Sequence, residues 1–466
     1  MKNGNILTFF LGGLIFSSYF ANAEEKPNFI IINCDDMGYG DMGCFGHPTI
    51  KTPELDRMAY EGQRWTSFYV AASVSSPSRS GLMTGRLGIH TGMYGDKRVV
   101  LFPDSPKGLP KEELTMATIL KNEGYNTACF GKWHLGHKPE AMPWSRGFDE
   151  FYGIPYSNDM SQKEQKNVYG NKNYKYPLPF YENDKVLEFE PDQTQFTKRL
   201  TIRAVQYIRE QTEKPFFLYL AHPMPHVPVY ASEKFQNTSK RGQYGDVIEE
   251  IDWSVGQILK TLKEKNLDKN TLVIFTSDNG PWLTFKENGG SAGLLKDGKN
   301  STYEGGFRVP CIMWGAMLKP GVISEMGSTL DLLPTFCEMA NIKLPSDRKY
   351  DGFSLYPTLT KQENIKREYY YFYRGSELYA VRKGKYKIHF MTKQAYGPGK
   401  KIILKTPLLY NIEEDPEERY DIADKYPEIV KELEAYTQQY KAHETIKESI
   451  FDLPAEKQST NSRLKN

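Results

Sequence analysis

Apolar runs of strand length recur between residues 28 and 314, and they constrain the fold more than any other feature of this sequence. The runs are NFIIIN (28–33), NTACFG (126–131), PFFLYLA (215–221), TLVIFTSDNG (271–280) and VPCIMW (309–314). Each run is bounded by turn residues or by charge, which is typical of buried strands. The sequence therefore predicts a sheet with a large apolar core.

Helical patterns occupy the intervals between these runs. Thr52 and Pro53 form an N-cap and first-turn pair before ELDRMAYEG, which Gly62 closes. A second helix is predicted where five apolar residues recur at helical spacing, namely Val247, Ile251, Val255, Ile258 and Leu262. Strands that alternate with helices predict an α/β fold with a mostly parallel sheet covered on both sides. In such a sheet the chemistry belongs outside the carboxyl ends of the strands.

The composition of the sequence changes at about residue 367. The stretch EYYYFYRGSELYAVRKGKYKIHF mixes aromatic, β-branched and charged residues, which predicts a small antiparallel sheet. A helix is expected to follow, with Ile429, Leu433, Tyr436 and Tyr440 on one side. We therefore predict an N-terminal domain over residues 24–366 and a C-terminal subdomain over residues 367–466.

The first 23 residues have the pattern of a signal peptide. Lys2 precedes the apolar run ILTFFLGGLIFSSYF, and the small residues ANA follow it and end at Ala23. The run is too short to span a membrane, so we expect no membrane anchor. The formal net charge of +2 and the lack of a long basic run predict no nucleic-acid partner. Five scattered cysteines form no disulfide framework, and a single bridge stays open.

Two of the predicted strands end in acidic or amide side chains. Asp35 and Asp36 follow the first run, and Asp278 and Asn279 end the fourth. Because strand ends lie close together in such a sheet, these four oxygen donors can converge on one cation. Oxygen-only ligation favours calcium or magnesium over zinc, and several carboxylates without a demanding spacing favour calcium. The alternative, turn chemistry at each motif, is disfavoured by the two matching contexts.

Basic and imidazole side chains lie beside other strand ends. Lys132 and His134 follow the second run, His222 and His226 follow the third, and Lys299 precedes the fifth. Each of these residues alone is more often a solvated surface residue, but several such motifs together favour a site. Cations near a divalent metal repel one another unless an anion joins them, so the expected ligand carries sulfate or phosphate.

The stretch SVSSPSRSGLMTGR (73–86) places several serines beside fixed positive charge, with no acid or histidine next to them. Arg79 lies four positions after Ser75, and the residues after Pro77 are expected to begin a helix. A helix N-terminus with a guanidinium group suits a tetrahedral oxyanion. The alternative is a plain N-cap, for which Ser75, Ser76 or Ser78 would qualify.

These motifs carry a family resemblance. SSPSRSGLMTGR resembles the signature of the type I sulfatases, in which Cys or Ser is followed by any residue, Pro, Ser and Arg, and then by a Thr-Gly-Arg ending. DDMGYGD, GKWHLG, PHVP, TSDNG and STYEGGFRVP occur in the family order. GIPYSNDM, YAVRKGKYKIHF and TPLLYNIEEDPEERYDI resemble the arylsulfatase A branch, and the stretch from PHVPVYASEKF through RGQYGDVIEEIDWSVGQIL also resembles N-acetylgalactosamine-6-sulfatases. The resemblance implies an alkaline-phosphatase-like sandwich with a large mixed, mostly parallel sheet flanked by helices, plus a small C-terminal antiparallel sheet with a helix.

The resemblance also implies a mechanism. Ser75 would be oxidised after translation to formylglycine (3-oxoalanine), whose hydrate attacks sulfur, and a second hydroxyl then collapses the adduct and expels sulfate. Carried over position by position, the calcium ligands are Asp35, Asp36, Asp278, Asn279 and modified Ser75.

Five further residues receive roles from the same resemblance. Arg79 and Lys132 hold the nucleophile and the sulfate charge, and His134 deprotonates the second hydroxyl. His226 and Lys299 lie near the leaving oxygen, where one of the two acts as general acid. The sequence leaves open which of these two residues donates the proton.

The implied substrate is a sulfated glycan. An exo-acting sulfatase would remove a 6-O or 4-O sulfate from galactose or N-acetylgalactosamine, and the candidate substrate contacts are Asn158, Asp159, His222 and Arg374. Serine at position 75, where animal members carry cysteine, implies the bacterial serine-type branch and a sulfatase-maturing enzyme as partner. With the signal peptide, it predicts export to the periplasm or secretion. The alternatives are a broad arylsulfatase, a phosphatase or phosphodiesterase of the same fold with two metals, and a non-catalytic sulfoglycan-binding protein with unmodified Ser75.

Overall fold

A fully buried strand forms the centre of the protein. In the computed structural model, which describes Met1 and residues 25–361, 363, 367–395 and 399–455, β1 (Asn28–Cys34) has parallel neighbours on both sides. Its alternate residues Phe29 and Ile31 pack into one apolar core, whereas Ile30 and Ile32 pack into another. Because both faces of this strand are apolar, the sheet needs a layer of helices on each side.

The large sheet has eleven strands and is mixed. Its parallel centre runs in the order β8 (Thr271–Ser277), β1, β7 (Phe216–Ala221), β3 (Asn126–Lys132) and β4 (Glu150–Ile154). Beyond β8 lie antiparallel β9 (Arg308–Trp314) and then β2 (Gln63–Tyr69), with β10 (Gly321–Ile323) and β11 (Gly327–Ser328) parallel to β2. Beyond β4 lie antiparallel β5 (Pro179–Glu182) and β6 (Lys185–Phe189). All five predicted strands are confirmed.

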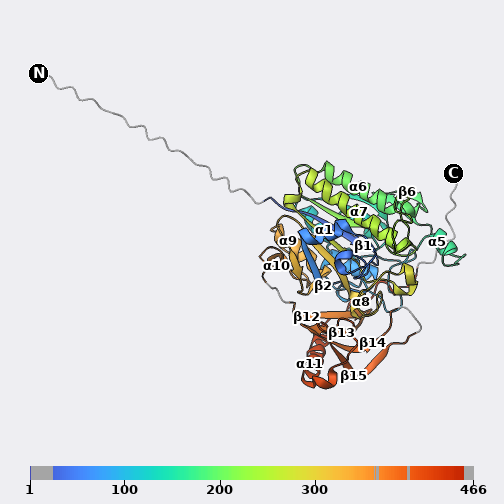
Figure 1. The fold of residues 1–466 in the computed structure, drawn as a ribbon, viewed down its shortest axis with the longest axis vertical. Coiled ribbons are helices and arrows are strands. Elements are labelled where there is room, and N and C mark those ends of the chain that lie inside the picture. Colours follow the sequence, from blue (N-terminus) through green and yellow to red (C-terminus); the bar gives the residue numbers. More distant parts are fainter. Residues whose placement is uncertain (2–24, 362, 364–366, 396–398, 456–466) are drawn as a thin grey trace.

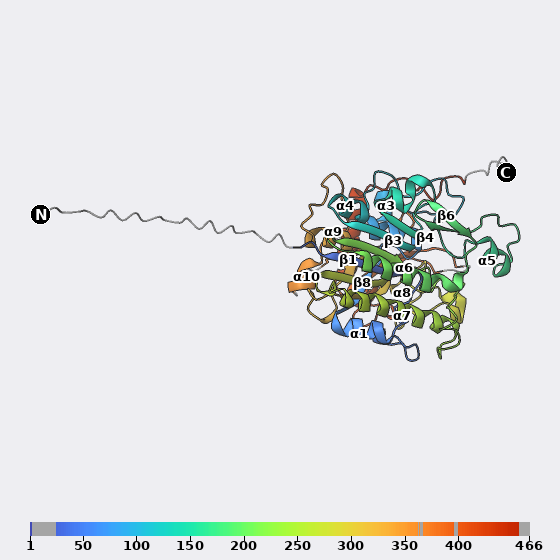
Figure 2. The ribbon, with the colours of Figure 1, turned by 90° about the horizontal axis from the view of Figure 1, so that it is seen from above.

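Helices cover both faces of this sheet. One face packs against α1 (Pro53–Glu61), α6 (Phe196–Glu210) and α7 (Gln243–Glu264), and the other against α2 (Ser75–Thr84), α4 (Met116–Asn122) and α9 (Leu332–Met339). Figure 2 shows α4 and α9 on one side of the strands and α1 and α7 on the other. The shorter helices are α3 (Gly88–Thr91), α5 (Gln162–Asn167), α8 (Glu304–Phe307) and α10 (Tyr356–Lys361). The predicted helices over 53–61 and 247–262 are confirmed.

The C-terminal residues form a separate antiparallel sheet, at the lower end of Figure 1. Its strands are β12 (Tyr369–Arg374), β13 (Glu377–Lys383), β14 (Tyr386–Thr392) and β15 (Ile402–Asn411), in that order. The helix α11 (Pro427–His443) packs on this sheet through stacked rings, with Tyr369 over Tyr436 at 3.6 Å and Tyr371 over Tyr440 at 4.0 Å. The predicted small sheet with a helix is confirmed.

One detail differs from the sequence expectations, one open question is answered, and one prediction lies outside the described residues. Thr52 occupies the N-cap position of α1, but its hydroxyl accepts the N–H of Gly43 (2.8 Å) instead of capping the helix. All five cysteines lie in the described part of the chain, and each is unpaired. The predicted signal peptide, apart from Met1, lies outside the described residues. No helix among the described residues has both the length and the apolar character needed to cross a membrane.

A histidine joins the end of the chain to the large domain. His90 on α3 contacts Asp351 Oδ2 through Nδ1 (2.7 Å) and Glu444 Oε2 through Nε2 (2.6 Å). Burial by itself would lower the pKa of His90, but the hydrogen bonds and charges of the two carboxylates raise it above its usual value. A protonated His90 can donate to both carboxylates at once.

We expect this contact to stabilise the fold in a pH-dependent way. Because the pKa of His90 is raised in the folded state, its contribution is fully present below about pH 6.5 and is lost as the pH rises through the folded value. Urea denaturation between pH 5.5 and 8.5 should show that His90→Gln lowers the free energy of unfolding by about 1–3 kcal/mol at the acidic end and by less at the basic end. His443→Gln, at an exposed position of α11, is the matched control. A loss that is constant with pH would contradict the assignment.

Candidate active site

Three buried aspartates meet where β1 and β8 end. Asp35 and Asp36 follow β1 and Asp278 follows β8, and one carboxylate oxygen from each lies within 4.8 Å of the others. The two strands are paired in parallel up to Cys34 and Ser277, so the residues that follow them emerge at the same edge of the sheet. Asp36 adopts a left-handed conformation (φ 66°), and its N–H donates to Asp278 Oδ1 at 3.1 Å. The structure thus brings together the acidic strand ends that the sequence singled out.

Asn279 adds a fourth oxygen donor to this cluster. Its amide nitrogen donates to Asp36 Oδ1 at 2.7 Å. Its Oδ1 atom is buried and has no hydrogen-bond partner among the described residues. A buried acceptor without a donor is costly, and a cation bound at this position would satisfy it. The donor set therefore fits a hard divalent cation such as Ca²⁺.

Ser75 is the first residue of α2 and points its hydroxyl at this cluster. The Oγ atom donates to Asp35 Oδ1 at 3.1 Å, and Lys132 Nζ lies 3.4 Å from the same Oγ. The helix begins two residues before Pro77 rather than after it, and Val74 occupies the N-cap position without a side-chain bond. None of the motif serines therefore caps the helix, and the plain N-cap alternative is wrong. The positive end of the helix dipole falls at Ser75.

Three cations compensate the three carboxylates. The Nε atom of Arg79 donates to Asp278 Oδ2 at 2.8 Å. Lys132 Nζ donates to Asp35 Oδ2 at 2.5 Å, and Lys299 Nζ donates to Asp36 Oδ2 at 2.8 Å. Each cation comes from a different element: α2, the end of β3, and the loop before α8. The cluster is therefore balanced in formal charge.

Burial and charge shift the pKa values of this cluster in opposite directions. Burial by itself would raise the pKa of Asp35, but Lys132 and other nearby positive groups hold it at about 2. Burial lowers the pKa of Lys132. Burial would also lower the pKa of Arg79, but Asp278 raises it above its usual value. Asp35 is thus an ionised acceptor beside Ser75.

The two histidines of the site differ in their surroundings. His134, with φ 61°, donates from Nε2 to the carbonyl of Leu101 at 2.9 Å, and its Nδ1 is buried without a hydrogen-bond partner among the described residues. Burial lowers the pKa of His134 well below its usual value, so the ring is neutral and Nδ1 can accept a proton. His226 donates from Nδ1 to Val227 O (2.6 Å), and its Nε2 lies 3.6 Å from Asp36 Oδ2.

Two predicted substrate contacts have buried structural partners. The amide nitrogen of Asn158 donates to Gln193 Oε1 (3.1 Å) and to the carbonyl of Pro228 (3.3 Å), in the loop that carries His226. His222 bonds Ser254 Oγ of α7 through Nε2 (3.2 Å), and burial lowers its pKa to about 3. The observed contacts of His222 are therefore with the helix layer rather than with the aspartate cluster.

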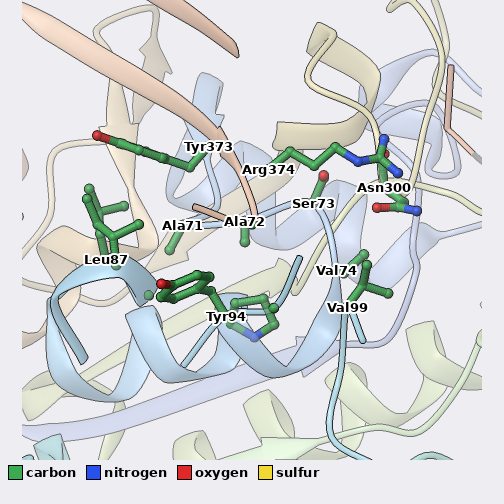
Figure 3. Close-up of a pocket in the computed structure, with 15 residues that line it drawn as sticks. Ala71, Ala72, Ser73, Val74, Leu87, Tyr94, Val99, Asn300, Tyr373 and Arg374 are labelled. Atoms are coloured by element: carbon green, nitrogen blue, oxygen red, sulfur yellow. The ribbon is translucent and has the colours of Figure 1, made fainter. Parts of the chain in front are cut away.

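The other two predicted substrate contacts lie at different places. Asp159 is partly exposed, and its substrate role stays a prediction. Arg374 extends from β12 toward Asn300 and donates to its carbonyl oxygen; Figure 3 shows the two side by side at a pocket that Ser73 and Tyr94 also line. The free volume of this pocket is about 30 Å³, which suits water and not a sugar ring. Arg374 thus contacts the loop next to Lys299, and its substrate role stays a prediction.

The structure adds three residues that the sequence reasoning missed. Ser157 accepts from Lys132 Nζ at 3.2 Å, and its position beside Asn158 in the quoted motif was an available signal. Tyr219 on β7 has its hydroxyl 3.4 Å from Arg79 Nη1, but a tyrosine in an apolar strand gives no signal of its own. Trp282 contacts both candidates for the general acid at the leaving oxygen. Lys299 Nζ lies 4.4 Å from its ring centroid, and the His226 ring centroid lies 5.4 Å from it.

Comparison with known proteins gives concordant results over most of the chain. The family model described as Sulfatase matches residues 27–342, and the model described as the C-terminal region of aryl-sulfatase matches residues 365–462. The chain is 38% identical to the N-acetylgalactosamine-6-sulfatase of Mus musculus over 91% of this chain and 87% of that protein. It is 38% identical to the arylsulfatase A of Homo sapiens over 88% of this chain and 86% of that protein. The crystal structure of Ps i-CgsB in complex with k-i-k-neocarrahexaose superposes with a TM-score of 0.74, at 31% identity over 89% of this chain and 93% of that one.

Arg79 tests the charge balance of the site. Arg79→Met leaves Asp278 buried without its bonded cation, so we expect the free energy of unfolding to fall by about 3–5 kcal/mol. The measurement is urea denaturation in a buffer that contains a chelator, so that no divalent cation compensates the carboxylates. Arg57→Met, which removes an exposed ion pair with Glu54 on α1, should cost less than about 1 kcal/mol. Equal losses in the two variants would contradict the role given to Arg79 here.

Proposed function

The chain belongs to the sulfatase family and is a sulfatase enzyme, and from this we propose that it is an exo-acting carbohydrate sulfatase. Its substrate would be a galactose or N-acetylgalactosamine unit of a sulfated glycan, and the bond broken would be the 6-O or 4-O sulfate ester. The observation that carries the proposal is Ser75 at the amino end of α2, between Asp35 and Lys132. The N-acetylgalactosamine-6-sulfatase relatives and the oligosaccharide bound to a structural neighbour support the substrate class.

Two groups complete the proposed site. Formylglycine made from Ser75 would supply, as its hydrate, the oxygen that attacks sulfur. Ca²⁺ would be held by Asp35, Asp36, Asp278 and Asn279 together with modified Ser75, and it would polarise the sulfate oxygens. The unpartnered Oδ1 of Asn279 and the all-oxygen donor set fit this ion.

The side chains of the protein would bind the anion and move the protons. Arg79 and Lys132 would hold the nucleophile and offset the charge that builds on the sulfate oxygens. His134, neutral and with a free Nδ1, would take the proton of the second hydroxyl so that the S-linked oxygen leaves with sulfate. His226 or Lys299 would give a proton to the departing sugar oxygen, and Trp282 holds both near Asp36.

The alternatives differ in what supports them. A broad arylsulfatase is the second candidate function, favoured by the 38% identity to arylsulfatase A. A two-metal phosphatase would need further metal ligands, whereas the described residues hold one group of three or more acidic, histidine or cysteine ligands. A sulfoglycan-binding protein would have the same geometry with unmodified serine at position 75.

The remaining parts of the proposal concern maturation and organisation. We propose that this is a bacterial serine-type member, that a sulfatase-maturing enzyme modifies Ser75, and that residues 1–23 direct export to the periplasm or secretion. The catalytic domain would span residues 24–366 and the C-terminal subdomain residues 367–466.

Sulfate release tests the reaction and the substrate together. Protein co-expressed with a maturing enzyme should release sulfate from either the 6-sulfated or the 4-sulfated form of galactose or N-acetylgalactosamine, and Ser75→Ala should abolish release while the circular dichroism spectrum stays unchanged. The tryptic peptide of residues 65–79 should be lighter by two hydrogens in the active protein. Release by Ser75→Ala would overturn the mechanism. An intact aldehyde with no release from the panel would remove this substrate class but keep the chemistry.

Calcium binding can be measured without activity. Ca²⁺ at about 100 times its Kd should add about 2.7 kcal/mol to the free energy of unfolding and raise the melting temperature. Asn279→Leu removes a predicted ligand and should reduce this shift, whereas Asn288→Leu, ten residues from Asp278 in the following loop, should keep it. A melting temperature that is insensitive to both Ca²⁺ and chelator would contradict the assigned metal site.

A further inference from the structure

Three of the sequence motifs that the proposed chemistry leaves without a role meet in one buried ion cluster. Glu304 belongs to STYEGGFRVP, Lys387 to YAVRKGKYKIHF and Glu418 to TPLLYNIEEDPEERYDI. Lys387 Nζ lies 3.0 Å from Glu304 Oε1 and 3.0 Å from Glu418 Oε1, and the three side chains have no exposed surface. His389 adds a contact from Nε2 to Glu418 Oε1 at 2.7 Å. The cluster thus joins β14 of the C-terminal sheet to α8 of the large domain.

The two carboxylates of this cluster stay ionised although they are buried. Burial by itself would raise the pKa of Glu304, but Lys387 and two nearby arginines hold it at about 2. Lys387 likewise lowers the pKa of Glu418 against the effect of burial. A buried ion pair adds little stability compared with an apolar contact of the same size, whereas its directed bonds fix the relative position of the two parts. Both carboxylates are thus ionised in a place where apolar packing would stabilise equally well.

The ion cluster is also hydrogen-bonded to the backbone at the start of α8. Glu418 Oε2 accepts the N–H of Glu304 at 2.7 Å, and the carbonyl oxygen of Glu418 accepts from Lys296 Nζ at 2.9 Å. The N–H of Gly305 in turn donates to the carbonyl of Lys296 at 2.9 Å. Both ends of the loop 296–304 are therefore bonded to one residue of the C-terminal subdomain.

This loop carries Lys299. The N–H of Lys299 donates to Pro281 O (2.9 Å), and that of Asn300 donates to Ser73 O (2.7 Å), two residues before the nucleophile position. From the other side, Arg374 of β12 donates to the carbonyl of Asn300. Figure 3 shows these two residues side by side. The loop thus lies between the residues that precede α2 and the C-terminal sheet.

We propose that Glu304, Lys387 and Glu418 are positioning residues through which the C-terminal sheet sets the place of Lys299 beside the leaving oxygen. The inference rests on the proposed function, in which Lys299 acts at that oxygen. Its consequence is that the small sheet takes part in catalysis through the position of Lys299.

Leaving-group dependence separates positioning from simple stability. A sugar alkoxide needs a proton or a positive charge as it departs, whereas 4-nitrophenolate leaves without help. In Lys387→Met, kcat/KM for N-acetylgalactosamine 6-sulfate should fall by about tenfold more than kcat/KM for 4-nitrophenyl sulfate, and Lys299→Ala should show the same selectivity. Glu304→Gln, an isosteric change, is the second variant in case Lys387→Met folds poorly.

Ile388→Ala is the matched control, because Ile388 is adjacent to Lys387 on β14 and packs into the C-terminal core. This change should lower the melting temperature and reduce both activities by the same factor. Hydrogen exchange gives a readout without turnover: the amides of residues 299–304 should exchange faster in Lys387→Met and Glu304→Gln, and not in Ile388→Ala.

The outcomes distinguish the two proposals. The positioning role would be overturned if Lys299→Ala lost more kcat/KM for the sugar sulfate than for 4-nitrophenyl sulfate, while Lys387→Met and Glu304→Gln showed neither this difference nor faster amide exchange at residues 299–304. A lack of selectivity in Lys299→Ala would instead overturn the proposed role of Lys299 at the leaving oxygen. If the wild type released no sulfate from the sugar, the proposed substrate would fail, and unchanged exchange at 299–304 in the cluster variants would still overturn the structural link.

Discussion

The concentration of buried negative charge at the ends of β1 and β8 is the constraint on which the rest of this structure depends. Three carboxylates within 4.8 Å of one another would repel strongly in a medium of low polarity. Cations from separate elements offset this repulsion, namely Arg79 from α2, Lys132 from the end of β3 and Lys299 from the loop before α8. The same ion pairs thus fix where that helix and that loop lie relative to the parallel centre of the sheet.

Two histidines at one site acquire different abilities from their surroundings. The carbonyl of Leu101 accepts a hydrogen bond from Nε2–H of His134, and burial keeps the ring neutral, so that the proton-accepting lone pair lies on Nδ1. His226 instead has its Nδ1 bonded to the backbone carbonyl of Val227, and its Nε2 lies 3.6 Å from Asp36 Oδ2.

The C-terminal sheet is connected to this chemistry through ions and not through an apolar interface alone. Lys387 of β14 and Glu418, which follows β15, contact the start of α8, and Arg374 of β12 contacts Asn300. Three contacts of the C-terminal residues therefore converge on one loop beside the large sheet. His90 makes a separate connection, because its Nε2 bonds the carboxylate of Glu444, the residue after α11. The small C-terminal sheet is therefore connected to the large sheet and its helices by directed polar bonds.

The sequence by itself determined the fold class, the five buried strands and the acidic strand ends, because apolar periodicity and turn residues act locally. The motif around Ser75 also pointed to a serine without its own base, although Val74 rather than a serine occupies the N-cap position. Only the tertiary structure decided which candidates meet. Lys299 reaches Asp36, which is 263 residues away in the chain, whereas His222 faces α7 and Arg374 bonds a backbone carbonyl. Strand order, helix placement and side-chain direction produce these contacts, and no local pattern encodes them.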